Sequence, residues 1–327
     1  MASDFECFDL TKLGTSVRGG HAYVEEGRLV LQRMTPEMGR FFERTEMEKI
    51  RKRCAAGIRL VFRSNTAAIR ARFRFGVHAR KAFVVETIVD GVSHPVDFTE
   101  GDGTGTVWQA ENSEKRERTF SIWLPLYAET EILEWALSPG ASFELEATDS
   151  PRWIAIGDSI TQGMSASTPA RSWAAQLSRS KNLDLWNFGV GGAIMEPELA
   201  SYIRGEDYAV LTIAFGTNDC FSGRPLKEYQ AAYRDFFSRF VPPKDRQPRI
   251  FILGPPCRID CPPNALGLKL EDYQRALEDV CGELPAVQYI NGFSLIPEEE
   301  PYFPPGDLHP NDLGMEAFAK NLAAYFG

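Results

Sequence analysis

The hydrophobic pattern of this chain changes its period at Ser150 and Pro151, and this change constrains the fold more than any other feature of the sequence. From residue 151 onward, short apolar runs alternate with helix-like stretches. The apolar runs cover residues 153–156, 185–188, 209–214 and 250–253, with a weaker one at 287–290, and the helix-like stretches cover 172–180, 226–240, 270–282 and 313–325. This alternation predicts a parallel sheet with helices on both faces, and ligands of such sheets bind at the carboxyl ends of the strands.

The preceding part, from residue 58 to about 147, has the shorter period of antiparallel strands. Between residues 69 and 75, four apolar residues alternate with three arginines, which is typical of a strand with one buried and one solvated face. A run rich in β-branched residues at 82–89 ends at an Asp-Gly pair, a strong hairpin signal. Two more strands are expected at 119–126 and 141–147. The spacing of these strands predicts a β-sandwich of jelly-roll type.

Two features of the first part have more than one interpretation. The three arginines of the alternating strand, Arg70, Arg72 and Arg74, form a stripe that indicates either an ordinary solvated face or a groove for a polyanion. The charged stretch at residues 43–53 is consistent with a surface helix or with a loop.

Charge and composition exclude several classes of partner. The chain has 36 basic and 45 acidic residues, and its net charge is −9. Neither part is basic, since residues 1–150 carry 20 basic and 23 acidic side chains and residues 151–327 carry 16 and 22. We therefore expect no nucleic-acid or membrane partner. The acidic start of the chain differs from a signal peptide, which predicts a cytoplasmic protein, and the oligomeric state is left open.

The six cysteines are scattered, which favours free thiols over a disulfide framework. Cys257 and Cys261 are close in sequence, but none of the four histidines is near this pair, and we expect no metal site there.

Four short blocks, three at predicted strand ends and one just ahead of the last helix, carry the residue types of acyl-transfer chemistry. Ser159 follows the first apolar run of the second part, within the block GDSITQG of residues 157–163. Gly192 ends the block NFGVGG (187–192), and Asn218 lies in GTND (216–219). His309, in GDLHPNDLG (306–314), is the one histidine of the second part and hence the local candidate for a base. A serine hydroxyl needs such a base, and a developing oxyanion needs preorganised N–H donors.

In order and spacing, these four blocks resemble the SGNH (GDSL) hydrolase superfamily. The resemblance implies a flavodoxin-like three-layer α/β/α hydrolase domain over residues 151–327, preceded by an antiparallel, jelly-roll-like β-sandwich domain over residues 1–150. It implies that Ser159 is the nucleophile and His309 the general base. It further implies that the Ser159 N–H, the Gly192 N–H and the Asn218 side chain form the oxyanion hole. This chemistry requires neither a cofactor nor a metal.

The acid of the site departs from the family pattern. The family usually places it three residues before the histidine, where this chain has Gly306, and Asp307 stands two residues before instead. Either Asp307 orients His309, or a backbone carbonyl does so and the site is a Ser–His dyad. Asp312 is expected to cap the last helix, and Asp158 is expected to bind neighbouring backbone rather than join the chemistry.

The substrate is predicted from the size of the second part and from the resemblance. The short segments between the blocks leave no room for a lid, and an open site favours short acyl groups. A β-sandwich ahead of such a domain resembles two-domain carbohydrate esterases. We therefore expect a serine esterase for acetyl-type esters of a carbohydrate or a glycosylated small molecule. The alternatives are an acyltransferase that uses the same serine, and a carbohydrate-binding protein whose hydrolase domain is inactive.

Overall fold

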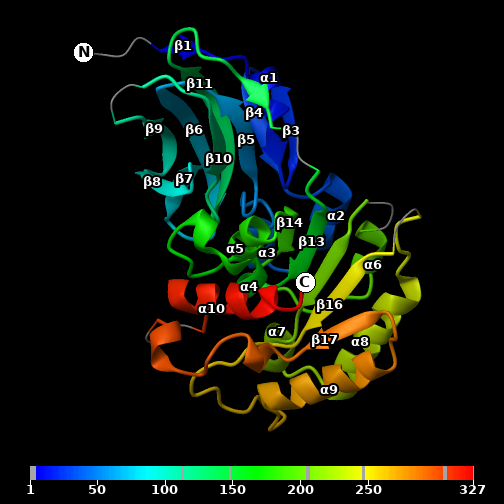
Figure 1. Ribbon diagram of the computed structural model, residues 1–327. Coiled ribbons are helices and arrows are strands. Elements are labelled where there is room, and N and C mark those ends of the chain that lie inside the picture. The colour runs from blue at the N-terminus through cyan, green and yellow to red at the C-terminus, as the bar shows by residue number, and fades with distance from the viewer. Residues whose placement is uncertain are drawn as a thin grey trace. The chain divides into compact units, whose positions relative to one another are not determined.

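The computed structural model describes residues 5–111, 114–146, 149–203, 207–244, 247–304 and 308–326 (Figure 1). The chain packs into two compact units. The first contains residues up to 35, 50–149 and 168–170, and the second contains residues 36–49, 150–167 and 171–327. None of the helices within the described ranges is long and apolar enough to cross a membrane.

Two short segments therefore pack with a different unit from their neighbours in the chain. Residues 36–49 belong to the second unit, where Arg44 pairs with Glu196, and the Phe41 and Tyr202 rings lie 5.6 Å apart. Residues 168–170 belong to the first unit, because the buried Glu86 carboxylate accepts the N–H of Ala170 at 2.7 Å.

The described strands of the first unit form two antiparallel sheets of six strands. One sheet has the order β3-β4-β11-β6-β9, with β1 paired to β11, and the other has the order β12-β5-β10-β7-β8, with β2 paired to β5. The strands of the first sheet are β1 (Glu6–Cys7), β3 (His21–Glu25), β4 (Arg28–Gln32), β6 (Ala68–His78), β9 (Gly101–Gln109) and β11 (Ala128–Leu137). Those of the second are β2 (Val17–Arg18), β5 (Arg59–Ser64), β7 (Phe83–Val89), β8 (Val92–Phe98), β10 (Arg118–Trp123) and β12 (Glu144–Leu145).

The predicted sandwich is confirmed, and its core lies between the inner faces of these sheets. Phe62 of β5 stacks on Phe120 of β10 at 5.4 Å and meets Trp135 of β11 edge-on at 6.3 Å, so aromatic side chains of both sheets share one apolar cluster. The predicted hairpin joins β7 to β8, and its turn residues Asp90 and Gly91 have φ angles of 51° and 78°, which an Asp-Gly pair tolerates. The α1 helix (Leu10–Gly14) also belongs to this unit.

The arginine stripe is a solvated face with acidic partners. Arg72 lies 3.1 Å from Glu134 of β11, and Arg74 lies 3.0 Å from Asp102 of β9. Because the neighbouring strands supply carboxylates to two of its three arginines, most of the positive charge of the stripe is balanced, which argues against a polyanion groove. The charged stretch at residues 43–53 contains a helix, α3 (Glu46–Arg51), which follows α2 (Pro36–Phe41).

The second unit contains a parallel sheet of five strands in the order β14-β13-β15-β16-β17. Its strands are β13 (Arg152–Gly157), β14 (Asp184–Gly189), β15 (Val210–Ala214), β16 (Arg249–Leu253) and β17 (Val287–Ile290). This is the flavodoxin-like order, as predicted, and its switch point lies at β13 between β14 and β15. In the parallel register Gly157 faces both Gly189 and Ala214, so three strand ends meet at one edge.

Helices cover both faces of this sheet (Figure 1). On one face α5 (Trp173–Ser180) packs on α10 (Asp312–Ala323), where the Trp173 and Phe318 rings stack at 4.6 Å. On the other face α8 (Leu226–Arg239) packs on α9 (Leu270–Gly282), where the Tyr229 and Tyr273 rings lie 5.2 Å apart. Three further helices are short and come after the ends of β13, β14 and β15, respectively: α4 (Ser159–Gln162), α6 (Leu199–Tyr202) and α7 (Thr217–Phe221).

Candidate active site

Ser159 is the first residue of α4 and comes two residues after the end of β13. The turn requires a glycine before it, because a Cβ on Gly157 would lie 2.7 Å from the carbonyl oxygen of Ala214. Asp158 caps the helix, since its carboxylate accepts the N–H of Ile160 at 2.9 Å, as expected for a residue that binds neighbouring backbone. The chain then leaves α4 through Gly163 at a φ of 100°. Short, tightly packed turns at both ends of α4 therefore set the position of the Ser159 hydroxyl.

Burial makes Asp158 an unusual carboxyl group. It is 3% exposed, and this burial, together with the nearby charge of Asp219, raises the pKa of Asp158 to about 7. A neutral carboxyl still accepts the Ile160 N–H, so capping does not require ionisation.

His309 lies against Ser159, although 150 residues separate the two in the chain. The His309 Nε2 atom is 2.8 Å from the Ser159 Oγ atom, and the two residues are 8% and 5% exposed. With its proton on Nδ1, the imidazole accepts the hydrogen bond of the serine hydroxyl, which is the arrangement of a nucleophile and its base.

The predicted acid, Asp307, and Gly306 lie outside the described residues. Asp307 therefore stays a prediction. The expectation that Asp312 caps the last helix is wrong: the cap is Asn311, whose Oδ1 atom accepts the N–H groups of Leu313 (3.0 Å) and Gly314 (3.1 Å). Asparagine and aspartate cap helices about equally well, so the local sequence does not discriminate between these neighbours.

Gly192 lies on a loop that is tied to α4. Its φ of 90° falls in the left-handed region, which favours glycine. Just before it, the side chain of Gln162 accepts the N–H of Gly191 at 2.9 Å, and the side chain of Asn187 donates to the carbonyl of Thr161 at 2.8 Å. Within the described ranges, the N–H groups of Ser159 and Gly192 have no hydrogen-bond acceptor. Both are available to a substrate oxygen.

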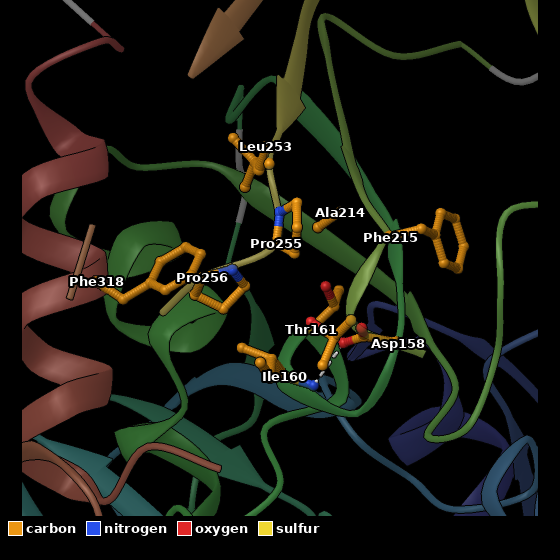
Figure 2. Close-up of a pocket in the computed structure, with 11 residues that line it drawn as sticks. Asp158, Ile160, Thr161, Ala214, Phe215, Leu253, Pro255, Pro256 and Phe318 are labelled. Atoms are coloured by element: carbon orange, nitrogen blue, oxygen red, sulfur yellow. Dashed lines mark hydrogen bonds between the residues drawn. The ribbon is translucent and has the colours of Figure 1, made fainter. Parts of the chain in front are cut away.

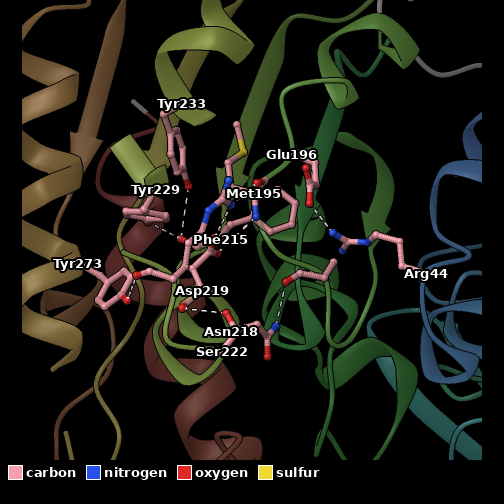
Figure 3. Close-up of polar contacts among 12 residues, drawn as sticks. Arg44, Met195, Glu196, Phe215, Asn218, Asp219, Ser222, Tyr229, Tyr233 and Tyr273 are labelled. Carbon is pink, nitrogen blue, oxygen red and sulfur yellow. Dashed lines mark hydrogen bonds and ion pairs between the residues drawn. The ribbon is translucent and has the colours of Figure 1, made fainter. Parts of the chain in front are cut away.

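Asn218, in α7, reaches the other side of the same loop (Figure 3). Its Nδ2 atom donates one hydrogen bond to the carbonyl of Ala193 at 2.9 Å. An amide nitrogen carries two protons, so one donor remains. The Asn218 side chain therefore supports the loop of Gly192 and has an N–H left for a ligand.

A buried ion pair completes this loop and was not foreseen from the sequence. Asp219 lies 2.9 Å from Arg224, and Arg224 also donates to the carbonyl of Met195 at 2.6 Å. The N–H of Met195 in turn donates to Asp219 at 3.3 Å (Figure 3). Burial raises the pKa of Asp219 to about 6, and Arg224 opposes that rise. Arg224 carried no sequence signal, because five residues and a turn separate it from Asp219.

A cavity lies behind the nucleophile turn (Figure 2). Its described lining includes Asp158, Thr161, Thr217, Leu253 and Phe318, but not the candidate catalytic residues. The hydroxyls of the two threonines are buried and have no partner among the described residues. The cavity therefore lies among residues that pack around the α4 turn, and we do not assign it as the substrate cleft.

The described residues contain no cluster of His, Cys, Asp and Glu side chains suited to hold a metal ion. The six cysteines are free thiols, and burial raises the pKa of Cys220 and of Cys257 to about 12. A thiol with such a pKa stays protonated and is a poor metal ligand or nucleophile at neutral pH.

Comparison with known proteins gives a family match for the second part of the chain. Residues 155–317 match the model of the GDSL-like Lipase/Acylhydrolase family. No curated protein matches the sequence.

Several solved structures share the fold over nearly the whole chain. The salicylyl-acyltransferase SsfX3 from a tetracycline biosynthetic pathway aligns with a TM-score of 0.80 and 22% identity, over 95% of this chain and 94% of that one. A protein from Bacteroides ovatus, named as a GDSL-like lipase, aligns with a TM-score of 0.76 and 19% identity, over 98% and 96%. The acetyl xylan esterase Est2A from Butyrivibrio proteoclasticus aligns with a TM-score of 0.63 and 12% identity, over 99% and 98%. At these identities the likeness concerns the fold.

Proposed function

Through residues 155–317 the chain belongs to the GDSL-like lipase/acylhydrolase family, and it is a carboxylic ester hydrolase. From this premise we propose that it is a serine esterase for acetyl-type esters of a carbohydrate or glycosylated small molecule. In this proposal Ser159 is the nucleophile and His309 the base. The observation that carries it is the 2.8 Å contact between the Ser159 hydroxyl and His309 Nε2 at the carboxyl edge of the sheet.

The reaction has two steps. The Ser159 Oγ atom attacks the ester carbonyl carbon while His309 Nε2 takes the hydroxyl proton, and His309 then gives that proton to the departing alcohol. Water next attacks the acyl-serine, with His309 again taking and returning a proton, and the carboxylic acid leaves. The N–H groups of Ser159 and Gly192 and the remaining amide proton of Asn218 stabilise the oxyanion of each tetrahedral intermediate. Each such donor contributes about 3 kcal/mol in other hydrolases.

Two observations support a short acyl group. Residues 164–172 contain one 3₁₀ turn (Pro169–Arg171), and residues 192–198 contain no helix, so neither of these two segments supplies a helical flap. A solved structure of the same two-part fold is an acetyl xylan esterase, which supports an acetylated carbohydrate as the substrate class.

A second candidate function is acyl transfer by the same serine, in which an alcohol replaces water in the second step. The structural likeness to a salicylyl-acyltransferase at a TM-score of 0.80, which extends over both units, favours keeping this candidate. Product analysis with an added alcohol acceptor separates the two functions, because a transferase forms the new ester faster than free acid.

The central test is Ser159→Ala with p-nitrophenyl acetate. We expect kcat to fall by at least about 10³-fold, because the nucleophile is lost while the oxyanion donors remain. The control is Ser180→Ala, which removes the hydroxyl of an exposed residue at the end of α5, where it donates to the carbonyl of Leu177 at 3.1 Å. If Ser159→Ala folds and keeps the turnover of the wild type, Ser159 is not the nucleophile.

A further inference from the structure

Asp312 lies three residues after His309, in the first turn of α10, yet its carboxylate is not used by its own helix. It binds the segment that follows the candidate nucleophile. Asp312 Oδ1 accepts the backbone N–H of Ser167 at 2.8 Å, and Oδ2 accepts the Ser167 hydroxyl at 2.6 Å. Oδ2 also lies 3.3 Å from Arg171 Nη1. Both carboxylate oxygens are thus committed to residues about 145 positions earlier in the chain.

Ser167 is held close to Ser159 by a compact turn. The carbonyl of Ser159 accepts the N–H of Met164 at 2.9 Å, and the carbonyl of Gly163 accepts the N–H of Ala166 at 3.1 Å. A φ of 73° at Ser165 folds the chain back within this segment. Because this segment is short and hydrogen-bonded, a displacement of Ser167 is expected to displace Ser159 as well.

On the other side, the chain from Asp312 back to His309 is equally short. It consists of Pro310, whose ring restricts φ, and Asn311, which caps α10. The Asn311 N–H donates to the carbonyl of Tyr302 at 2.9 Å, and its side chain donates to the carbonyl of Pro301 at the same distance. These bonds hold Asn311 against residues 301–302, and the Asp312 bonds hold the first turn of α10 against Ser167.

These contacts connect the nucleophile and the base on both sides. The short turn joins Ser159 to Ser167, and two hydrogen bonds join Ser167 to Asp312. Two residues separate Asp312 from His309, whose Nε2 atom lies 2.8 Å from the Ser159 hydroxyl. We propose that Asp312 is a positioning residue that sets the distance between the Ser159 hydroxyl and His309, an inference that rests on the proposed function. Proton transfer requires such groups within about 0.5 Å of their working geometry. A misplacement of about 1 Å costs up to about 10²-fold in rate.

A role in stability alone does not account for this arrangement. The ion pair with Arg171 is exposed at the guanidinium, whose side chain is 60% accessible, and such pairs contribute little. The two bonds to Ser167 carry most of the interaction, and they join the two loops that present the nucleophile and the base.

The test compares Asp312→Ala and Asp312→Asn with Asp272→Ala. Asp272 is a matched control, because it lies in the first turn of α9, accepts a backbone N–H (that of Lys269, 2.8 Å) and pairs with the nearby Arg275. We measure kcat and KM with p-nitrophenyl acetate, the second-order rate of Ser159 modification by a fluorophosphonate, and urea unfolding. A fluorophosphonate reports on the activation of the serine without a full turnover.

For Asp312→Ala we expect kcat and the fluorophosphonate rate to fall together by about 10- to 100-fold, with KM within about twofold of the wild type. Asp312→Asn keeps an acceptor for the Ser167 N–H and is expected to recover a large part of the loss. The inference is overturned if Asp312→Ala has the kcat and labelling rate of Asp272→Ala, or if its kcat loss appears only where the protein is partly unfolded. The Ser159→Ala variant separates the two proposals: its full activity would reject the nucleophile, whereas an inactive Ser159→Ala beside a fully active Asp312→Ala rejects the positioning role alone.

Discussion

Replacement of Asp158 by asparagine tests how the fold holds the residue beside the nucleophile. The pKa of Asp158 is raised from 3.8 to about 7, chiefly by burial, so the folded protein holds this proton more tightly than the unfolded chain does. The stability that the neutral carboxyl contributes is complete below pH 4 and is lost as the pH rises through 7. Asparagine resembles the neutral acid and still accepts the Ile160 N–H. The Asp158→Asn variant therefore lacks this pH dependence.

The magnitude follows from the two pKa values. A rise of about 3 units, at about 1.4 kcal/mol per unit, corresponds to about 4 kcal/mol between the limiting pH values. Between pH 5 and pH 8 about 3 kcal/mol of that change is realised, since the unfolded chain is already ionised at pH 5 and the folded one ionises near pH 7. The free energy of unfolding of Asp158→Asn, relative to the wild type, should rise by about this amount over that interval.

The assay is urea unfolding at pH 5, 6, 7 and 8, followed by circular dichroism at 222 nm, which reports mainly on the helices of the second unit. Asp219 titrates in both proteins and largely cancels from the difference. A difference between the two proteins that stays constant from pH 5 to pH 8 would refute the reasoning, because Asp158 would then be ionised in the folded state throughout. The kcat of the variant at pH 7 should stay within about threefold of the wild type, because the capping bond survives.

Three further predictions concern the loop of Gly192, the acid and the acyl group. Arg224→Met leaves the buried Asp219 charge uncompensated and should lower the free energy of unfolding by about 3–5 kcal/mol. The control Arg234→Met breaks an exposed pair with Glu283 and should lower it by less than about 1 kcal/mol. Equal losses for the two variants in urea unfolding would contradict this prediction. Asp307→Asn should lower kcat by about 10⁴-fold if Asp307 orients His309, and a loss near tenfold would instead favour a backbone carbonyl. The kcat/KM for p-nitrophenyl acetate should exceed that for the octanoate, and a steady climb with acyl length, which would follow from about 0.8 kcal/mol per buried methylene, would reject an open site.

Local sequence was sufficient for the two kinds of sheet and for their order, although the strands before residue 58 and the long β9 and β11 were not predicted. The change of period near residue 150 predicted an antiparallel sandwich followed by a parallel sheet, and both are confirmed. The Asp90-Gly91 hairpin was also predictable, because its backbone geometry depends on those two residues alone. The candidate residues Ser159, Gly192 and Asn218 lie in blocks that each follow a strand, and parallel strands bring their carboxyl ends to one edge. The resemblance of these blocks to the SGNH hydrolases selected the three residues within them.

Contacts between distant segments were decided only by the tertiary structure. The structure argues against a polyanion groove at the arginine stripe, because acids on β9 and β11 pair with Arg72 and Arg74. The register of these strands with β6 is set by sheet packing. The sequence also assigned the cap of α10 to Asp312 and left Arg224 unnoticed. Asn311 and Asp312 have similar capping propensities, so local sequence does not show which of them caps α10. In the folded chain Asn311 is the cap, and the Asp312 carboxylate binds Ser167, which lies 145 residues earlier. Such a partner is invisible to any local pattern, because only the folded chain brings it within hydrogen-bond distance.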